Sequence, residues 1–177
     1  MTILTTARLT LRPFTQADAP AYALIRLHAQ VLPWLPPPPG GEKPLATAQR
    51  MIDHFGQCWA ERGVGPWAVC DRRSGELLGH CGLRYLPDFD GVEALWTLHP
   101  DTWGRGLASE AAAASLDFGF GPAGLPSIFA ITLPDNRASR GVMEKIGMGY
   151  RRSLEWKGFT VVYYDIDRGA WHSRRQP

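Results

Sequence analysis

Two glycines, Gly104 and Gly106, lie between an apolar stretch and an alanine-rich stretch of the chain. Residues 92–98 combine β-branched, aromatic and aliphatic side chains, which predicts a strand, and residues 108–118 consist largely of strong helix formers. Glycine lets a ligand approach the backbone closely. The first amides of a helix have no partner within the helix and lie at its positive end. Many joins of this kind only turn the chain, but the chemistry that this one suits is the binding of a phosphate or pyrophosphate.

The spacing around the glycines argues against two common nucleotide-binding motifs. A Walker A loop requires G-x-x-x-x-G-K-[ST], which the sequence does not contain. A dinucleotide-binding fingerprint requires a third glycine or an alanine where this chain has Ser109. From Asp101 to Gly106 the spacing instead fits the pattern R/Q-x-x-G-x-G/A, with an aspartate in place of the first residue.

Glu93 interrupts the apolar run before the glycines and is a candidate for proton transfer. On a strand, residues 93, 95 and 97 face one way and residues 94, 96 and 98 face the other. The carboxylate therefore lies either on a solvated face of the sheet or in a pocket. In a pocket, burial would raise its pKa, as suits a general base. An alternative role is to bind the ammonium group of an acceptor.

Two blocks of the sequence resemble one enzyme family. Residues 103–111, Trp-Gly-Arg-Gly-Leu-Ala-Ser-Glu-Ala, are similar to the W-G-x-G-[YL]-A-[TS]-E-A signature of the GNAT superfamily of N-acetyltransferases. Residues 136–148 are similar to its N-x-x-S-x-x-V-x-x-K-x-G-[FM] block. Together they look like the branch that contains the RimJ/RimL-type ribosomal-protein N-terminal acetyltransferases, and a weaker resemblance covers residues 8–168. The departure at Asp101 leaves the pyrophosphate contacts to backbone amides and to Arg105.

The resemblance implies an acetyl-CoA-dependent enzyme that transfers the acetyl group to a primary amine by direct attack on the thioester. It also implies the coenzyme-binding residues, which are Leu98, His99, Trp103, Gly104, Arg105, Gly106, Leu107, Ala108, Ser109, Asn136 and Ser139. Glu93 matches the family's glutamate in the strand before the loop and is expected to act as the base, directly or through water. Ser139 stands where many other superfamily members carry a tyrosine acid, and its hydroxyl suits a hydrogen bond to the coenzyme sulfur. Asn136 and Ser139 are equally well placed to cap the next helix.

The acceptor site is expected to involve the proline-rich residues 31–44, which cannot form a helix interior or a central strand. A stiff connector is one reading of this segment. The other is a wall of the acceptor pocket, with Trp34 and Leu35 on a polyproline-like frame, and the resemblance favours it. Tyr85 and Trp156 are further candidates, with core packing as the stronger alternative.

The identity of the acceptor stays open at this point. The narrow resemblance favours a protein N-terminal α-amine, and small amines, amino acids and antibiotics are the alternatives. Two other classes of function compete with catalysis: a module that binds acyl-CoA without turnover, and a nucleotide-binding domain of another fold.

The predicted elements must bring these residues together. Strands are predicted at residues 8–14, 67–70, 77–86, 92–98, 127–132, 150–156 and 159–167, and helices at residues 15–28, 45–62, 108–118 and 136–146. We therefore expect an α/β (α+β) fold, a GNAT-like single domain over residues 1–177. Its central mixed, mostly antiparallel sheet has about seven strands and is flanked by about four helices, and residues 168–177 form a C-terminal tail.

Composition narrows the classes of function. With 177 residues, the chain is long enough for a single domain with a substantial core. A net charge of +2 without a long basic run argues against a nucleic-acid partner. No signal peptide or membrane span is apparent, so we expect a cytoplasmic protein with reduced cysteines and no membrane partner. The histidines lack metal-ligand spacing, so no metal is expected, and the final strand offers an edge for a homodimer.

Overall fold

A mixed eight-stranded sheet forms the centre of the computed structural model, which describes residues 2–35 and 39–175. The strands follow the order β1-β2-β3-β4-β5-β6-β8-β7, and every neighbouring pair is antiparallel except β5 and β6. Their bounds are Leu4–Thr5 (β1), Leu9–Arg12 (β2), Pro66–Asp71 (β3), Leu77–Leu86 (β4), Gly91–Leu98 (β5), Ser127–Thr132 (β6), Gly149–Trp156 (β7) and Phe159–Asp167 (β8).

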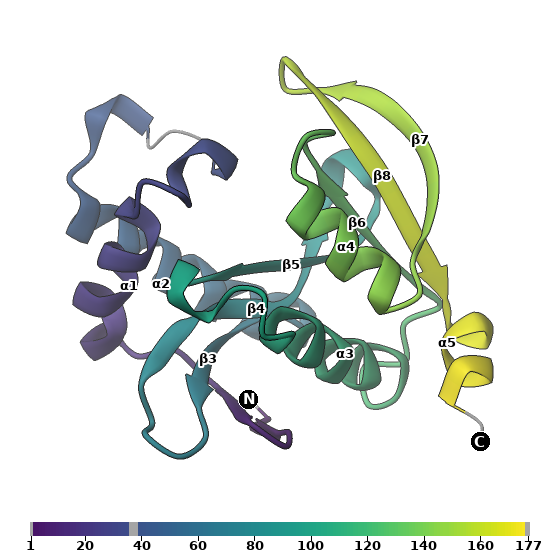
Figure 1. Cartoon of the computed structure of the whole chain (residues 1–177), viewed down its shortest axis with the longest axis horizontal. Coiled ribbons are helices and arrows are strands. Elements are labelled where there is room, and N and C mark those ends of the chain that lie inside the picture. Colours follow the sequence, from purple (N-terminus) through teal and green to yellow (C-terminus); the bar gives the residue numbers. More distant parts are fainter. Residues whose placement is uncertain (1, 36–38, 176–177) are drawn as a thin grey trace.

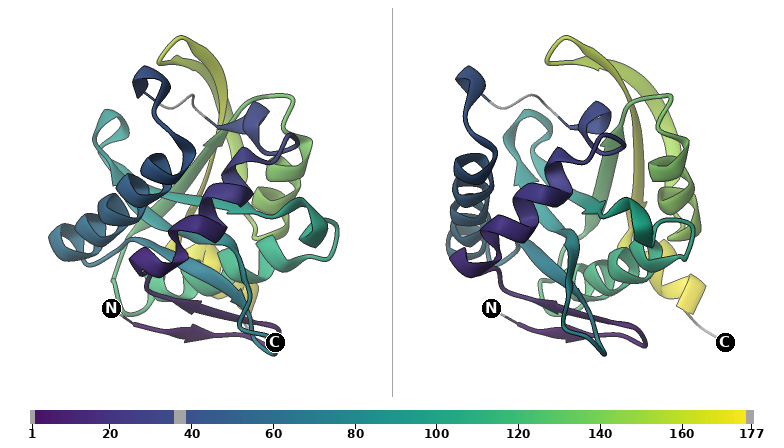
Figure 2. Two further views of the ribbon diagram at one scale, coloured as in Figure 1. Left: turned by 90° about the vertical axis from the view of Figure 1, so that its left-hand side faces the viewer. Right: turned by 60° about the vertical axis from the view of Figure 1, so that its left-hand side comes forward.

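Helices cover both faces of this sheet (Figures 1 and 2). They are α1 (Ala19–Leu27), α2 (Pro44–Arg62), α3 (Leu107–Phe120), α4 (Arg137–Lys145) and α5 (Arg168–Arg175). Two consecutive residues of β4 show which helices lie on which side. His80 contacts Tyr22 of α1 and Phe55 of α2, whereas Cys81 lies 3.6 Å from the hydroxyl of Ser115 in α3. The helix pair α1–α2 therefore packs on one face and α3 on the other.

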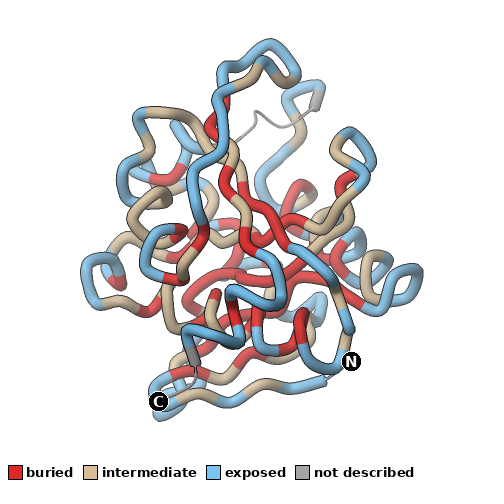
Figure 3. Tube along the Cα trace, turned by 90° about the vertical axis from the view of Figure 1, so that its right-hand side faces the viewer, coloured by how far each residue is buried: buried red, intermediate tan, exposed pale blue. Residues whose placement is uncertain are grey.

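Buried residues concentrate in the central strands and in the helix faces turned toward them (Figure 3). The larger core cluster includes Trp67, Leu83, Leu116 and Ile128, each at most 1% exposed. A smaller cluster joins α1 and α2 around Tyr22. Burial of one such side chain stabilises the fold by about 1.5–3 kcal/mol, so the two clusters fix the helices on the sheet.

The parallel strands β5 and β6 separate soon after they meet. Their ladder has a single pair of residues, Glu93 opposite Phe129. Beyond this pair, the backbone of β5 at residues 94–98 has β4 on one side and, within residues 2–35 and 39–175, no strand on the other. The resulting gap lies within the sheet rather than at its edge.

The mixed, mostly antiparallel sheet of the expected fold class is confirmed, with an eighth strand and a fifth helix added. The additional strand is the two-residue β1. The predicted tail at residues 168–177 is wrong for most of its length, because Arg168–Arg175 form α5 and Trp171 is buried beside Phe120.

The final strand does not offer the predicted edge for a homodimer. Strand β8 is hydrogen-bonded to β6 on one side and to β7 on the other, so the edge strand is β7. Of the segment 31–44, for which a polyproline-like frame was predicted, residues 36–38 lie outside the described residues, and residues 32–34 and 39–41 form short 3-10 turns instead. In the part of the chain that is described, no helix combines the length and the apolar composition needed to cross a bilayer.

Candidate functional site

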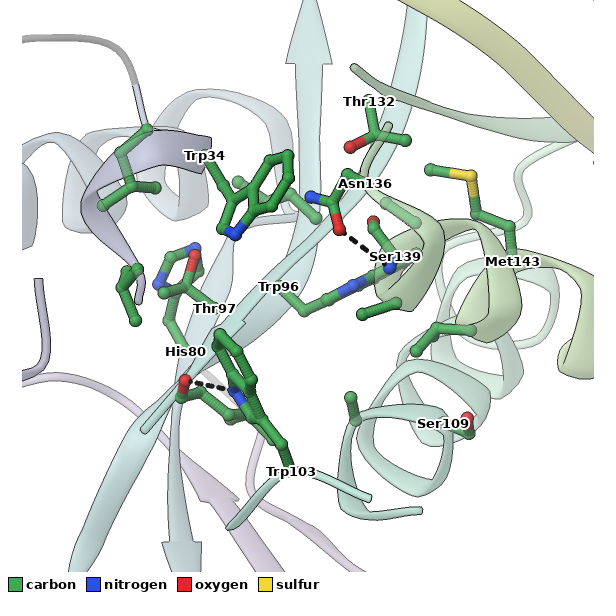
Figure 4. A pocket seen from close by; sticks show the side chains of 18 of the residues that line it. Trp34, His80, Trp96, Thr97, Trp103, Ser109, Thr132, Asn136, Ser139 and Met143 are labelled. Atoms are coloured by element: carbon green, nitrogen blue, oxygen red, sulfur yellow. Dashed lines mark hydrogen bonds between the residues drawn. The ribbon is translucent and has the colours of Figure 1, made fainter. Parts of the chain in front are cut away.

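A cavity of about 920 Å³ passes through the gap between β5 and β6 (Figure 4). We call one side the α1–α2 half; it is lined by Arg26, Val31, Trp34, Leu35, Thr47, Arg50, Met51, His54, His80, Arg84 and Glu93. We call the other side the α3 half; it is lined by Thr102, Trp103, Gly104, Gly106, Leu107, Ala108, Ser109, Ile131, Thr132, Asp135, Asn136, Arg137, Ala138, Ser139, Gly141, Val142, Met143 and Lys145. Residues 94–98 of β5 lie between the halves.

The α3 half contains the glycine-bounded helix start. Gly104 and Gly106 have φ angles of 73° and 76°, in the left-handed region that favours glycine. The amide of Glu110 donates to the carbonyl of Gly106 over 3.1 Å, which is the first helical hydrogen bond of α3. The amides of residues 107–109 therefore have no acceptor within the helix. Because these residues line the cavity, their amides are available to an anion that enters it.

Arg8 and Thr6 hold this helix start in place. The Arg8 guanidinium donates to Glu110 over 2.6 Å and to the carbonyl oxygen of Arg105 over 2.8 Å. The Thr6 hydroxyl also donates to the carboxylate of Glu110, over 2.6 Å. The glutamate of the 103–111 block therefore anchors α3 to the loop before β2. Arg105 does not line the cavity, so its predicted phosphate contact gains no support from the position of its side chain.

Trp103 fixes the end of β5. Its indole Nε1 donates to the carbonyl oxygen of Leu98 over 2.8 Å, a contact drawn in Figure 4. Both residues line the cavity. His99 does not line the cavity. Its Nδ1 accepts from the amide of Asp101 over 3.3 Å and caps the short turn after β5.

Asn136, and not Ser139, caps helix α4 with its side chain. The Asn136 side-chain oxygen accepts from the amide of Ser139 over 3.1 Å (Figure 4). Among the described residues, the Ser139 hydroxyl has no hydrogen-bond partner. Both residues line the α3 half, so the serine hydroxyl is available to a ligand there.

Glu93 is buried in the cavity wall, with 4% of its surface exposed. Its Oε2 accepts from Nε of Arg84, its cross-strand neighbour on β4, over 2.8 Å. Every fully enclosed side-chain nitrogen or oxygen in the described residues has a hydrogen-bond partner. The second carboxylate oxygen of Glu93 has none, so it opens into the cavity. Burial raises the pKa of Glu93, and the charge and hydrogen bond of Arg84 oppose this shift.

The residues predicted to bind an acceptor fall into two groups. Trp34 and Leu35 line the α1–α2 half, and Trp34 is 39% exposed. Tyr85 and Trp156 lie outside the lining of the cavity. The Tyr85 hydroxyl donates to Asp90 over 2.5 Å, and the Trp156 indole donates to Asp88 over 2.8 Å.

Several polar residues of the α1–α2 half were not predicted from the sequence, among them Arg26, His80 and Arg84. One signal could have placed Arg84. Residues 87–90 connect β4 and β5, and counting outward from that loop puts Arg84 opposite Glu93. His80 lies four residues earlier on the same face of β4.

Within residues 2–35 and 39–175, no group of three or more histidine, cysteine, aspartate or glutamate side chains is placed to hold a metal ion.

Two relatives illustrate the sequence matches. YkkB of Bacillus subtilis (strain 168), described as an uncharacterized protein, is 38% identical over 104 residues, which span 57% of this chain and 60% of YkkB. The match therefore covers less than two thirds of that relative. YoaA of the same organism, described as an uncharacterized N-acetyltransferase, is 30% identical over 148 residues, which span 82% of this chain and 81% of YoaA.

Two solved structures illustrate the structural matches. An acetyltransferase from Agrobacterium tumefaciens str. C58 has a TM-score of 0.80 and 29% identity, with 94% of each chain covered. Mycobacterium smegmatis RimJ in complex with CoA-disulfide shares the fold, with a TM-score of 0.75 and 23% identity over 93% of this chain and 86% of RimJ. Residues 8–149 match the family described as Acetyltransferase (GNAT) domain. The chain therefore belongs to the GNAT family of acetyltransferases.

Proposed function

We propose that the protein transfers the acetyl group of acetyl-CoA to a primary amine, with a peptide N-terminal α-amine as the leading candidate acceptor. The observation that carries the proposal is the continuity of the cavity. It joins the free amides at the start of α3 to the buried carboxylate of Glu93 through the gap between β5 and β6. A small amine or amino acid is the alternative acceptor.

The α3 half suits the donor. The free amides of residues 107–109 would bind the pyrophosphate at the positive end of the helix. The unpaired side of β5 at residues 94–98 offers backbone groups to the amides of the pantetheine arm. The same backbone can polarise the thioester carbonyl, where negative charge develops during acyl transfer.

Two side chains would serve the chemical step. As the amine nitrogen bonds to the thioester carbon and the carbon–sulfur bond breaks, the amine loses a proton to the base and CoA leaves as a thiolate, which takes up a proton from solvent. Glu93 would take the amine proton directly or through a water, because its free oxygen opens into the cavity and burial raises its pKa. The Ser139 hydroxyl would donate a hydrogen bond to the departing sulfur.

The substitution Glu93→Gln tests this assignment. The matched control is Glu61→Gln, at an exposed glutamate near the end of α2. We expect Glu93→Gln to lower kcat by about 10²–10⁴-fold, the usual contribution of a general base. Binding of CoA should be unchanged, because Glu93 lies outside the α3 half. CoA at about a hundred times its Kd should stabilise wild type and both variants by about 2.7 kcal/mol in thermal unfolding.

Three other outcomes would contradict the proposal in different ways. Stabilisation by CoA without acetylation of any amine would indicate a binding module. Stabilisation by ATP or NAD in place of CoA would indicate a nucleotide-binding domain of another kind. Acetylation that survives Glu93→Gln at the wild-type rate would leave the transferase intact and remove Glu93 as its base.

A further inference from the structure

The α1–α2 half carries a positive charge that no ion pair within the described residues neutralises. Three arginines line it, and two of them are paired: Arg50 with Glu42 over 3.0 Å and Arg84 with Glu93 over 2.8 Å. Arg26 forms no ion pair with any described residue. This half therefore has an excess of positive charge at Arg26.

Arg26 lies beside a buried hydrogen-bonded pair. Its guanidinium carbon is 5.9 Å from the centre of the Tyr22 ring, one turn away on α1. The Tyr22 hydroxyl lies 2.8 Å from Nδ1 of His80, and the two rings meet edge to face with centres 5.7 Å apart. Arg26 and His80 therefore flank the same tyrosine, and both line the cavity.

The Tyr22 hydroxyl determines which nitrogen of His80 carries the proton. Tyr22 is fully buried, and in the described residues Nδ1 of His80 is the hydrogen-bond acceptor within reach of its hydroxyl. The hydroxyl therefore donates to Nδ1, which leaves the imidazole proton on Nε2. Burial lowers the pKa of His80 to about 3, with the charges of Arg26 and Arg84 acting in the same direction, so the ring is neutral.

The Nε2–H group of His80 faces the cavity. His80 is 3% exposed, and Nε2 has no hydrogen-bond partner among the described residues. Every fully enclosed side-chain nitrogen or oxygen in the same residues does have one. Nε2 is therefore accessible from the cavity that His80 lines. Figure 4 shows His80 next to Thr97, its partner on β5.

We propose that the acceptor is an amine that also carries a carboxylate, and that Arg26 and the Nε2–H of His80 bind this carboxylate. This inference rests on the acetyltransferase function proposed above. A guanidinium and a fixed N–H donor match the two oxygens of a carboxylate, and a charge-assisted hydrogen bond to arginine is among the stronger polar contacts. Glu93 remains available for the amine.

The strand register indicates how far apart the two groups of the acceptor lie. Glu93 and Thr97, the partner of His80, are four residues apart on β5, which separates their backbone positions by about 14 Å. Side chains that lean together shorten this span, but several bonds between amine and carboxylate suit it better than the single carbon of an α-amino acid. An acidic side chain near a peptide N-terminus meets this requirement.

The test compares matched acceptors with and without the carboxylate. Peptides with aspartate or asparagine at the second or third position form one arm, and free amino acids with their carboxamides form the other. For the wild type we expect a KM about tenfold or more lower for the carboxylate member of one arm. The arm that shows this preference identifies the source of the carboxylate.

The variant Arg26→Gln should abolish the preference. We expect its KM for the carboxylate acceptor to rise about tenfold or more relative to its KM for the uncharged partner, with the effect falling on KM rather than on kcat. Arg26→Glu should reverse the preference toward acceptors with a basic group. Arg73→Gln, an exposed arginine in the β3–β4 turn outside the cavity lining, is the matched control.

Two kinds of result would overturn the inference, and only the second would also overturn the proposed transferase function. If the wild type acetylates charged and uncharged acceptors equally, or if Arg26→Gln affects both equally, only the carboxylate site is refuted. If no amine of either arm is acetylated although CoA binds, the proposed transferase function fails and this inference fails with it.

Discussion

Glu93 experiences two opposing influences on its proton. Burial raises the pKa of the carboxyl group, and the guanidinium of Arg84 lowers it. Replacing Arg84 with glutamine removes the second influence, so the pKa of Glu93 should rise further. Because a base must be deprotonated to act, the acid limb of the profile of kcat/KM against pH should move to higher pH in Arg84→Gln. Steady-state kinetics across the acidic range would measure this shift.

Arg84→Lys is the matched control, because it keeps the positive charge next to Glu93 and should move the acid limb less. An acid limb that stays in place in Arg84→Gln would show that another group titrates there. Unfolding at each pH should be followed in parallel, because removal of one partner leaves the other charge buried and destabilises the fold.

Single residues of the site differ in how far the sequence could predict them. Glu93 stands out in an apolar run, and its burial raises its pKa. Arg84 follows from counting outward from the loop at residues 87–90. The pair of Tyr22 and His80 does not follow from any local pattern, because the two residues are 58 positions apart and meet only when α1 packs on β4.

At the scale of elements, the start of α3 is the part of the site that the backbone builds. Gly106 precedes the helix with a φ of 76°, and an added Cβ would meet no atom closer than 3.7 Å. Strain, and not a clash, is therefore the cost of a side chain there. Gly106→Ala should destabilise the protein by about 1 kcal/mol, because alanine is strained at this backbone conformation. It should also weaken CoA binding, because a backbone that relaxes this strain changes the direction of the amides at residues 107–109. Urea unfolding and calorimetric titration with CoA would measure both.

Gly56 supplies the control for this prediction. It lies inside α2 with no atom within 4 Å of an added Cβ. Gly56→Ala should therefore stabilise the protein by about 0.5–1 kcal/mol and leave CoA binding unchanged. Equal effects of the two substitutions on CoA binding would argue against a special role for the α3 start.

The elements themselves were predictable where turn residues mark their ends. Strands β4, β6 and β8 have the bounds predicted from the sequence, at residues 77–86, 127–132 and 159–167. Strand β1 has two residues, too few for an alternating pattern. Helix α5 is polar except for the buried Trp171, so its packing could not be read from the sequence.

At the scale of the whole molecule, the gap between β5 and β6 separates two groups of residues that line the cavity. Helix α1 supplies Arg26 and strand β4 supplies His80 on one side of the gap, and α3 and α4 supply the free amides and Ser139 on the other. The sequence contains the motifs of the α3 half as contiguous blocks. The α1–α2 half is assembled from distant residues, which explains why its polar groups escaped prediction.

This assembly links the neutral state of His80 to the stability of the whole fold. In the native protein the pKa of His80 is about 3, because the ring is buried and the charges of Arg26 and Arg84 also disfavour its protonation. In the unfolded chain a histidine has a pKa of about 6.5. Between these values the unfolded chain binds a proton that the native protein does not. The stability present above about pH 6.5 is therefore lost progressively as the pH falls toward about 3.

The variant His80→Gln should remove this component of the acid sensitivity. Between about pH 8 and about pH 5, wild type should lose about 2 kcal/mol more of its free energy of unfolding than His80→Gln does. Glutamine keeps an acceptor for the Tyr22 hydroxyl. The control is His172→Gln, at an exposed histidine of α5, which should behave as wild type. Urea unfolding at the two pH values would measure the difference. Equal losses in wild type and His80→Gln would mean that His80 takes up its proton in the native protein over the same pH range as in the unfolded chain. A cationic His80 would then repel Arg26, and the tautomer on which the carboxylate site depends would be lost.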